Sequence, residues 1–411
     1  MTVEIVEKTE LGLLISPQRN QDVPVHNWYT FKHGFSRDLA LHIIDSFELS
    51  EGSWVLDPFC GGGTTLLTCK ELGINSRGFD ILPFSVFLTN VKTAKYDDAE
   101  LTKQLQELER DSNNQPVRDT LPDIPLVKKA FEPRVRDELL ILKYRIDKIS
   151  DPKIRSFFNL AFLGILEPVS NTSKSGGFLR IVERAVANHA IHSLFFEKAT
   201  AMVNDVAKNN EFMKNRNVSS IAKVGDARRL PTSRKYDAVI TSPPYPNRHD
   251  YTRIYSLEMI FDFVSSNEEL KRIRYETIRS HVEARKKYEA IGYRKPKILD
   301  TLIAEVKKNG TNNPQVITML EGYFEDMFLS LSEIFRCLKP KGKVGLVVSN
   351  VRFAGVNIVV DEILAEIGSQ IGLATKCIWV VRYRGNSSQQ MRDYKRKPSR
   401  ESIIIWEKDG K

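Results

Sequence analysis

The sequence feature that most limits the fold is the stretch DPFCGGGTT, residues 57–65. It follows an apolar run that predicts a strand over 53–59, and it precedes a predicted helix over 64–73. Consecutive glycines at the carboxyl end of a strand let a ligand approach the backbone closely, because no Cβ intervenes. Such a turn also occurs with glycines that serve only packing. This stretch alone therefore predicts a strand-turn-helix unit and leaves its ligand open.

The remainder of the chain alternates between short β-branched runs and amphipathic helical stretches. This alternation predicts an α/β fold with a mostly parallel sheet. Seven strands are expected, at 53–59, 76–82, 220–227, 236–242, 343–350, 374–383 and 401–407. The main helices are expected at 64–73, from Pro83 onward, and at 188–209, 321–340 and 360–372.

Two stretches interrupt this alternation, and 411 residues suit one large domain with sizeable insertions. The chain divides into an N-terminal and cofactor-binding part (1–96), a helical insertion (97–185), a part that ends in the second motif below (186–245), a basic insertion (246–320) and a final part with a basic loop and the last strand (321–411). Either insertion could recognise a target.

The charge balance favours an anionic partner, although a basic balance also suits many ordinary proteins. The formal net charge is +9, and residues 271–297 hold ten Lys or Arg against three Glu. The four cysteines are far apart and show no metal-ligand spacing, so neither a zinc site nor a disulfide framework is expected. The acidic N-terminus and the lack of a long apolar run predict a cytoplasmic protein without a membrane span.

The glycine turn has the wrong spacing for a dinucleotide fingerprint or a phosphate loop, so nothing calls for a pyrophosphate. Asp57 and Asp80 place carboxylates at the ends of two neighbouring strands. These groups could hold a cationic amino group and a pair of ribose hydroxyls. A nucleoside cofactor that carries an ammonium and no phosphate fits this arrangement, which predicts S-adenosylmethionine.

DPFCGGGTT resembles the cofactor loop of the amino-methylating DNA methyltransferases, usually Asp-Pro-Phe-x-Gly-Ser-Gly-Thr-Thr, with Gly62 where serine is usual. YTFKHGFSRDLALHII (29–44) is similar to the segment before the family's first strand, although His33-Gly34-Phe35 departs from its Phe-Pro. The resemblance implies a Rossmann-like class I methyltransferase. It also implies cofactor-binding roles for Lys32, Asp57, Pro58, Phe59, Gly61, Gly63, Thr64, Asp80, Asp226 and Ala227. Asp226 could instead be a turn residue.

The second motif, TSPPY (241–245), follows another apolar strand. Its two prolines fix two φ angles and remove two N–H donors, which leaves carbonyl acceptors in set directions. Acceptors aimed at an exocyclic amine make its nitrogen more nucleophilic. The expected catalytic residues are Ser242, Pro243, Pro244 and Tyr245, with the tyrosine ring as a stacking surface for an extruded base. Alone, the motif could be a polyproline turn or a ligand for a partner domain.

Within the resembled family, Ser-Pro-Pro-Tyr is typical of cytosine-N4 enzymes, and Asp or Asn in place of serine is typical of adenine-N6 enzymes. We therefore expect methyl transfer to cytosine N4 in double-stranded DNA. Adenine N6, a base amine in RNA, and a silent nucleic-acid-binding subunit remain alternatives. Cytosine C5 is disfavoured, because it needs a cysteine nucleophile that no strand-end loop supplies.

Several polar stretches could contact nucleic acid. The expected contacts are Asn171 and Lys174 in a glycine-ended loop, Arg248 and Arg253 after the second motif, and Arg384, Asn386 and Ser387 near the C-terminus. Tyr275, Tyr288 and Tyr293 interleave with the basic residues of 271–297, which could equally form a solvated helix. The family implies a restriction-modification or phage-defence setting, with a cognate restriction or defence protein as a possible partner.

Overall fold

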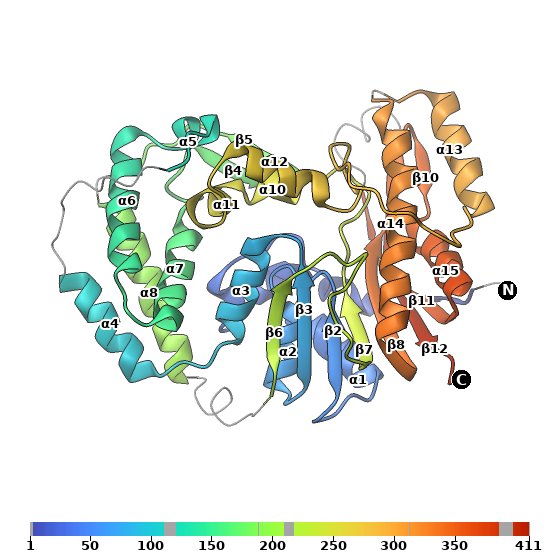
Figure 1. The fold of residues 1–411 in the computed structure, drawn as a ribbon, viewed down its shortest axis with the longest axis horizontal. Coiled ribbons are helices and arrows are strands. Elements are labelled where there is room, and N and C mark those ends of the chain that lie inside the picture. The colour runs from blue at the N-terminus through green and yellow to red at the C-terminus, as the bar shows by residue number, and fades with distance from the viewer. Residues whose placement is uncertain are drawn as a thin grey trace.

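A computed structural model describes residues 3–110, 121–187, 189–208, 218–311, 313–385 and 398–410. Its centre is a twisted sheet of eight strands in the order β1-β11-β12-β8-β7-β2-β3-β6 (Figure 1). The strands are β1 (Ile5–Glu7), β2 (Trp54–Asp57), β3 (Asn75–Asp80), β6 (Ser220–Val224), β7 (Tyr236–Thr241), β8 (Leu338–Ser349), β11 (Leu373–Arg384) and β12 (Ser399–Lys408).

The sheet confirms the α/β class and corrects the expected strand count from seven to eight. The pairs β6–β3, β3–β2, β2–β7 and β7–β8 are parallel, and β12 runs antiparallel to both β8 and β11. The additional strand, β1, pairs in parallel with the outer edge of β11. Its three residues are too few to give a periodic signal in the sequence.

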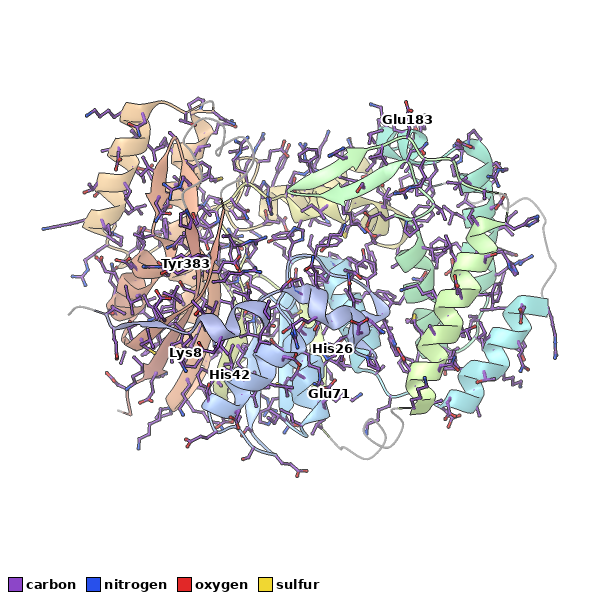
Figure 2. The ribbon with its side chains drawn as sticks, turned by 180° about the vertical axis from the view of Figure 1, so that it is seen from behind. Lys8, His26, His42, Glu71, Glu183 and Tyr383 are labelled. Carbon is purple, nitrogen blue, oxygen red and sulfur yellow. The ribbon has the colours of Figure 1, made fainter. Side chains whose placement is uncertain are left out.

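The segment that follows β1 crosses the back of the molecule, where Figure 2 labels Lys8, Tyr383, His26 and Glu71. The Tyr383 hydroxyl lies 2.6 Å from Glu7 Oε1, and the Lys8 ammonium lies 4.4 Å from the centre of the Trp379 ring. Further along, His26 Nε2 lies 3.2 Å from Glu71 Oε1. Short 3-10 helices occupy this segment: η1 (Thr9–Leu13), η2 (Pro17–Asp22) and η3 (His26–Trp28).

The alternation of side chains along the strands gives the sheet two apolar faces. Val55 and Ile240 pack on one face with α1 (Arg37–Ser46). Leu56 and Val239 pack on the other face with α14 (Gln315–Cys337) and α15 (Val360–Ile371). Two further helices, α2 (Thr64–Glu71) and α3 (Pro83–Thr93), connect β2, β3 and the first insertion. Parallel strands buried on both faces bring their carboxyl ends, and the loops that follow them, to one edge.

Parts of both insertions lie beyond this carboxyl edge, and the long helices of the first insertion stand beside the sheet, on the side of α3 and β6 (Figure 1). The first comprises α4 (Asp98–Arg110), α5 (Pro125–Ala130), α6 (Pro133–Asp147), α7 (Pro152–Ile165) and a hairpin of β4 (Thr172–Ser175) and β5 (Phe178–Ile181), and α8 (Ala190–Lys208) follows it. The second comprises α10 (Tyr251–Ile254), α11 (Ser256–Asp262), α12 (Asn267–Glu276) and α13 (Lys297–Asn309). A small sheet of β9 (Val351–Phe353) and β10 (Val356–Ile358) lies near α13.

One apolar cluster joins the two insertions to each other and to α3. Phe261 of α11 makes edge-on contacts with Phe131 and with Phe162 of α7, at centroid distances of 5.7 and 5.5 Å. Segments about a hundred residues apart therefore form one packed layer above the sheet edge. None of the helices in the described residues has the length and apolar character that a bilayer-crossing helix requires.

Candidate active site

The glycine turn after β2 is held in a shape that other residues adopt only with strain. Gly61 and Gly63 have φ angles of 46° and 78°, in the left-handed region that favours glycine. A Cβ on Gly63 would lie 2.8 Å from Thr89 Oγ1 of α3. The backbone of Gly61 donates a hydrogen bond of 2.9 Å to Asp80 Oδ2. The turn therefore approaches α3 closely and is fastened to the end of β3.

Gly62 stands where the resembled family usually has serine, and its neighbour Phe31 accounts for the difference. A Cβ on Gly62 would lie 2.7 Å from Cβ of Phe31, which is too close for two carbon atoms. The Phe31 ring is held in turn by stacking on Tyr255, with centroids 4.6 Å apart and planes inclined by 12°. The glycine thus makes room for an aromatic wall that the N-terminal segment contributes.

Two buried carboxyl groups lie at the ends of β2 and β3. Asp57 accepts hydrogen bonds from the Thr241 hydroxyl (2.5 Å) and the Phe59 backbone (3.1 Å). Asp80 accepts from the backbone of Gly61 and of Leu82, at 2.9 Å each. Burial raises the pKa of Asp57 to about 7 and that of Asp80 to about 6. Buried carboxylates gain from a cationic or hydroxyl-bearing ligand, because either compensates for the lost water.

Asp226, at the turn after β6, belongs to a buried network of four charged side chains. The Arg228 guanidinium donates two hydrogen bonds to Asp226, of 2.9 and 2.8 Å, and a third, of 3.0 Å, to Asp326 of α14. Asp326 also accepts from Arg279, at 2.7 Å through Oδ1. Burial alone would raise the pKa of Asp226, but the paired Arg228 holds it below its usual value. The network contains two acids and two arginines, so its charges balance.

Arg279 fixes a strap, residues 277–281, over the cavity. Besides its side-chain contacts, its backbone N–H donates to Asp326 Oδ2 at 2.8 Å. The residues on either side of it line the cavity: Thr277, Ile278, Ser280 and His281. The strap comes from the basic insertion, and nothing in its local pattern marks it as part of a cofactor site.

The second motif follows β7 directly. Thr241 ends that strand and donates to Asp57, so the two motifs are joined by a hydrogen bond at the sheet edge. Ser242 Oγ lies 3.1 Å from the Tyr245 hydroxyl. Burial raises the pKa of the Tyr245 phenol, which keeps it protonated. Ser242 and Pro244 line the cavity, whereas the Tyr245 ring packs partly against the core beside α14.

A single cavity contains most of the predicted cofactor and catalytic residues. Those that line it are Asp57, Pro58, Phe59, Gly61, Thr64, Asp80, Asp226, Ala227, Ser242 and Pro244. Gly63 caps α2 behind the turn, and Pro243 and Tyr245 adjoin the lining. Phe31, His33 and Phe35, from the segment 29–44 that resembles the family's, also line the cavity. Tyr251 and the strap line it too, and no local sequence pattern predicted a cofactor contact for either.

Lys32 points away from the cavity. Its ammonium donates to the Lys174 carbonyl at 2.7 Å and lies 3.5 Å from Glu167. Its neighbours in the stretch that departs from the family pattern, His33 and Gly34, line the cavity instead. Burial lowers the pKa of His33 to about 3, so its ring is neutral at physiological pH.

Lys174 is buried rather than exposed, which removes it from the surface that nucleic acid could reach. Its ammonium lies 2.5 Å from Glu258 Oε1 and 2.8 Å from the Tyr29 hydroxyl, and the Glu258 side chain is fully buried. The expected glycine-ended loop is in fact the β4–β5 hairpin. Asn171, at the base of this hairpin, donates through its backbone to Ala130.

The predicted arginines have different surroundings. Arg248 is exposed, with a φ of 70°, and its N–H donates to the carbonyl of Ser280 in the strap. Arg253 is half exposed and pairs with Glu283 at 2.6 Å. Arg384 is 60% exposed and pairs with Glu401 at 2.9 Å. Asn386 and Ser387 lie outside the described residues.

Comparison with known proteins identifies the family. A family model described as DNA methylase matches residues 15–89. The chain is 31% identical over 461 residues to the type II methyltransferase M.BsoBI of Geobacillus stearothermophilus, across 99% of this chain and 90% of that protein. The chain belongs to the amino-methylating DNA methyltransferase family. This confirms the resemblance that the two motifs carry.

The methyltransferase also matches M.AvaI of Nostoc sp. (strain PCC 7120 / SAG 25.82 / UTEX 2576), a type II methyltransferase, at 29% identity over 96% of this chain and 89% of that protein. Among solved structures, TrmN from Thermus thermophilus aligns with a TM-score of 0.34 and 10% identity, over 91% of this chain and 49% of that chain.

S-adenosylmethionine is the cofactor of the methyltransferase. The cavity fits this molecule on its own chemistry: the carboxyl group of Asp57 would receive the ammonium, and that of Asp80 would receive the ribose hydroxyls. Leu82, Ala227 and Ile278 supply apolar surface for a purine ring. Gly61 and Gly62 of the turn line the cavity, and a Cβ on Gly62 or Gly63 would displace the neighbouring Phe31 or Thr89 and so disturb this cradle.

Proposed function

We propose that this methyltransferase transfers the methyl group to the exocyclic N4 amine of a cytosine flipped out of duplex DNA, within a restriction-modification setting. The observation that carries the proposal is Ser242. This neutral residue, rather than an acid, lines the cavity at the end of β7, and its Oγ lies 3.1 Å from the Tyr245 hydroxyl. In the family, serine at this position is typical of cytosine-N4 enzymes.

The amine of cytosine is a weak nucleophile, because its lone pair is delocalised into the ring. Acceptors aimed at its two N–H groups favour a pyramidal nitrogen and the positive charge that develops during transfer. A serine hydroxyl has two acceptor lone pairs. Whichever hydroxyl donates in the Ser242–Tyr245 bond, Ser242 therefore keeps at least one lone pair for the amine. The Pro243 carbonyl supplies the second acceptor.

The hydrogen bond from Thr241 to Asp57 fixes the acceptors relative to the cofactor loop. Such preorganisation matters, because small errors in the approach of two reacting atoms slow a transfer considerably. The bound cofactor supplies an electrophilic methyl group on a sulfonium. The reaction breaks the S–C bond, leaves that electron pair on sulfur and forms the N–C bond. The product amine is first cationic and becomes neutral when it releases one proton to water.

A cytosine stacked in a duplex cannot bring its amine to a buried cavity, so the base must be extruded. Pro244 and the Tyr251 ring line the cavity beside Ser242 and offer apolar faces for the extruded base. The exposed guanidinium groups of Arg248 and Arg384, together with the half-exposed Arg253, suit contacts with the phosphates on either side of it.

The proposal is tested by identifying the product. The purified protein is incubated with S-adenosylmethionine and either unmethylated duplex DNA or RNA, and the nucleic acid is digested to nucleosides for mass spectrometry. We expect N4-methylcytosine from DNA, and a rate at least about a hundredfold lower for Ser242→Ala. N6-methyladenine would refute the cytosine assignment, and methylation of RNA alone would refute DNA as the substrate.

Tyr245→Phe serves as a matched variant, because it keeps the ring and removes only the hydroxyl that contacts Ser242. We expect it to lose less activity than Ser242→Ala, since Ser242 itself retains both lone pairs. Calorimetric titration with S-adenosylmethionine should give unchanged affinity in both variants. Unchanged affinity would show that the activity is lost with the hydrogen-bond acceptor and not through damage to the cofactor site.

A further inference from the structure

We propose that Phe178, at the tip of the β4–β5 hairpin, inserts into the DNA base stack and fills the gap that the flipped base leaves. The inference rests on the proposed base extrusion and adds a residue that acts on the DNA rather than on the cofactor. Four features carry it: the hairpin is anchored, its tip is docked beside the cavity, its outer face is exposed, and two exposed arginines, Arg180 and Arg248, lie near the tip.

The inner face of the hairpin is anchored in the protein. Lys174 on β4 forms the buried ion pair with Glu258 of α11. Leu179, directly opposite it on β5, packs against the apolar cluster of the insertions. At the base of the hairpin, the hydroxyl of Thr172 lies 2.6 Å from that of Ser170. These contacts make the hairpin rigid enough to keep its position when it contacts a duplex.

The tip is docked on residues that adjoin the active site. The Gly177 carbonyl accepts a hydrogen bond of 3.3 Å from the backbone of Asp250. A Cβ on Gly177 would lie 2.6 Å from Cδ2 of His249, so only glycine allows this approach. The His249 ring in turn makes an edge-on contact with the ring of His33, with centroids 5.6 Å apart, and His33 lines the cavity. A single layer of side chains therefore separates the tip from the cavity into which the base must move.

Phe178 follows this docked tip and faces outward. Side chains alternate along a strand, so Phe178 and Arg180 share the face opposite to the partly buried Leu179. The Phe178 side chain is 53% exposed, and Arg180 is exposed as well. Figure 2 places Glu183, which follows β5, at the end of the hairpin far from the sheet centre. An exposed aromatic ring next to the docked tip, with the Arg180 guanidinium on the same face of the strand, suits a wedge beside a phosphate contact.

Base extrusion creates the need for such a wedge. Removing a base from the stack costs a few kcal/mol, and proteins that unstack DNA insert apolar side chains between base steps. An aromatic ring is suited to this role, because it stacks on a base of any sequence. Arg248 is exposed immediately before His249, on which the tip is docked, and can hold the adjacent phosphate.

The hairpin offers its own matched control. Ile181 is also 53% exposed on β5, but it lies three residues further from the tip, about 10 Å away along the strand, and on the face opposite to that of Phe178. Phe178→Ala and Ile181→Ala thus remove equally exposed apolar side chains from one strand. Neither residue lines the cavity, so the unfolding midpoint and the affinity for S-adenosylmethionine should be unchanged in both.

The test measures kcat/KM for methyl transfer to a synthetic duplex that carries the mapped recognition site. We expect a loss of about tenfold or more for Phe178→Ala, a smaller loss for Phe178→Leu, and less than about twofold for Ile181→Ala. The loss for Phe178→Ala should shrink when the target base lies opposite an abasic site, because extrusion then breaks no base pair. Equal rates for Phe178→Ala and Ile181→Ala would overturn the wedge. Absence of DNA methylation by the unmodified protein would instead overturn the proposed function, and the wedge with it.

Discussion

Replacing Gly62 by alanine tests the explanation of the altered cofactor loop. The new Cβ would lie 2.7 Å from Phe31 Cβ and 3.1 Å from its Cγ, where carbon atoms normally stay about 3.5–4.0 Å apart. Ring rotation cannot relieve the contact, because Cβ is fixed to the backbone. The 31–32 backbone is itself held by a hydrogen bond of 3.2 Å from the Lys32 N–H to the Tyr255 hydroxyl. The main chain must therefore shift by roughly 1 Å, given that normal spacing.

Overpacking of this kind costs about 1–3 kcal/mol. We expect Gly62→Ala to lower the free energy of unfolding of the cofactor-free protein by that amount in urea titrations. Gly34→Ala is the control, because Gly34 lines the same cavity and a Cβ there meets no atom within 4 Å. Both substitutions reduce the entropy of the unfolded chain alike. Equal stabilities of the two variants would refute the role assigned to Phe31.

Three further predictions concern buried charges. Burial raises the pKa of Asp57 to about 7 and of Asp80 to about 6, so the free energy of unfolding of the cofactor-free protein should fall as pH rises from about 4 to 7. The affinity for the cofactor should rise as pH approaches 7, because Asp57 and Asp80 lose their protons, and binding should release protons. An affinity that is constant from pH 5 to 8 in calorimetry would contradict this. Lys174→Met leaves Glu258 buried without its positively charged partner and should lower the free energy of unfolding in urea by about 3–5 kcal/mol. Adding Glu258→Leu should recover most of that loss. A double variant no more stable than the single one would argue against the ion pair. Asp326→Asn should destabilise by about 3 kcal/mol and weaken S-adenosylmethionine binding through the loosened strap; unchanged affinity in a titration would disprove that coupling.

Local patterns were enough to predict the two motifs and their meeting point. The glycine turn and TSPPY each follow an apolar strand, and the carboxyl ends of parallel strands reach one edge of the sheet. The pairing of β2 with β7 therefore brings Asp57 within hydrogen-bonding distance of Thr241. The two strand-end carboxylates and the spacing of the glycine turn indicated the cofactor, and the family resemblance supplied the reaction, which periodicity alone could not.

The walls of the cavity could not be predicted, because distant parts of the chain build them. The strap is held over the cavity by the contact between Arg279 and Asp326 of α14, which are 47 residues apart and show no shared pattern. Lys174 was expected to contact nucleic acid because it sits between polar residues near two glycines. It is buried because Glu258, 84 positions later, supplies the opposite charge. The edge strand β1 is too short for its alternation to be recognised.

The most direct test of the proposed site is a structure of the methyltransferase with S-adenosylhomocysteine and a duplex that carries its mapped recognition site. We expect an extruded cytosine whose N4 lies within about 3 Å of both Ser242 Oγ and the Pro243 carbonyl oxygen. An extruded adenine at Ser242, or a target base that remains stacked in the duplex, would contradict it.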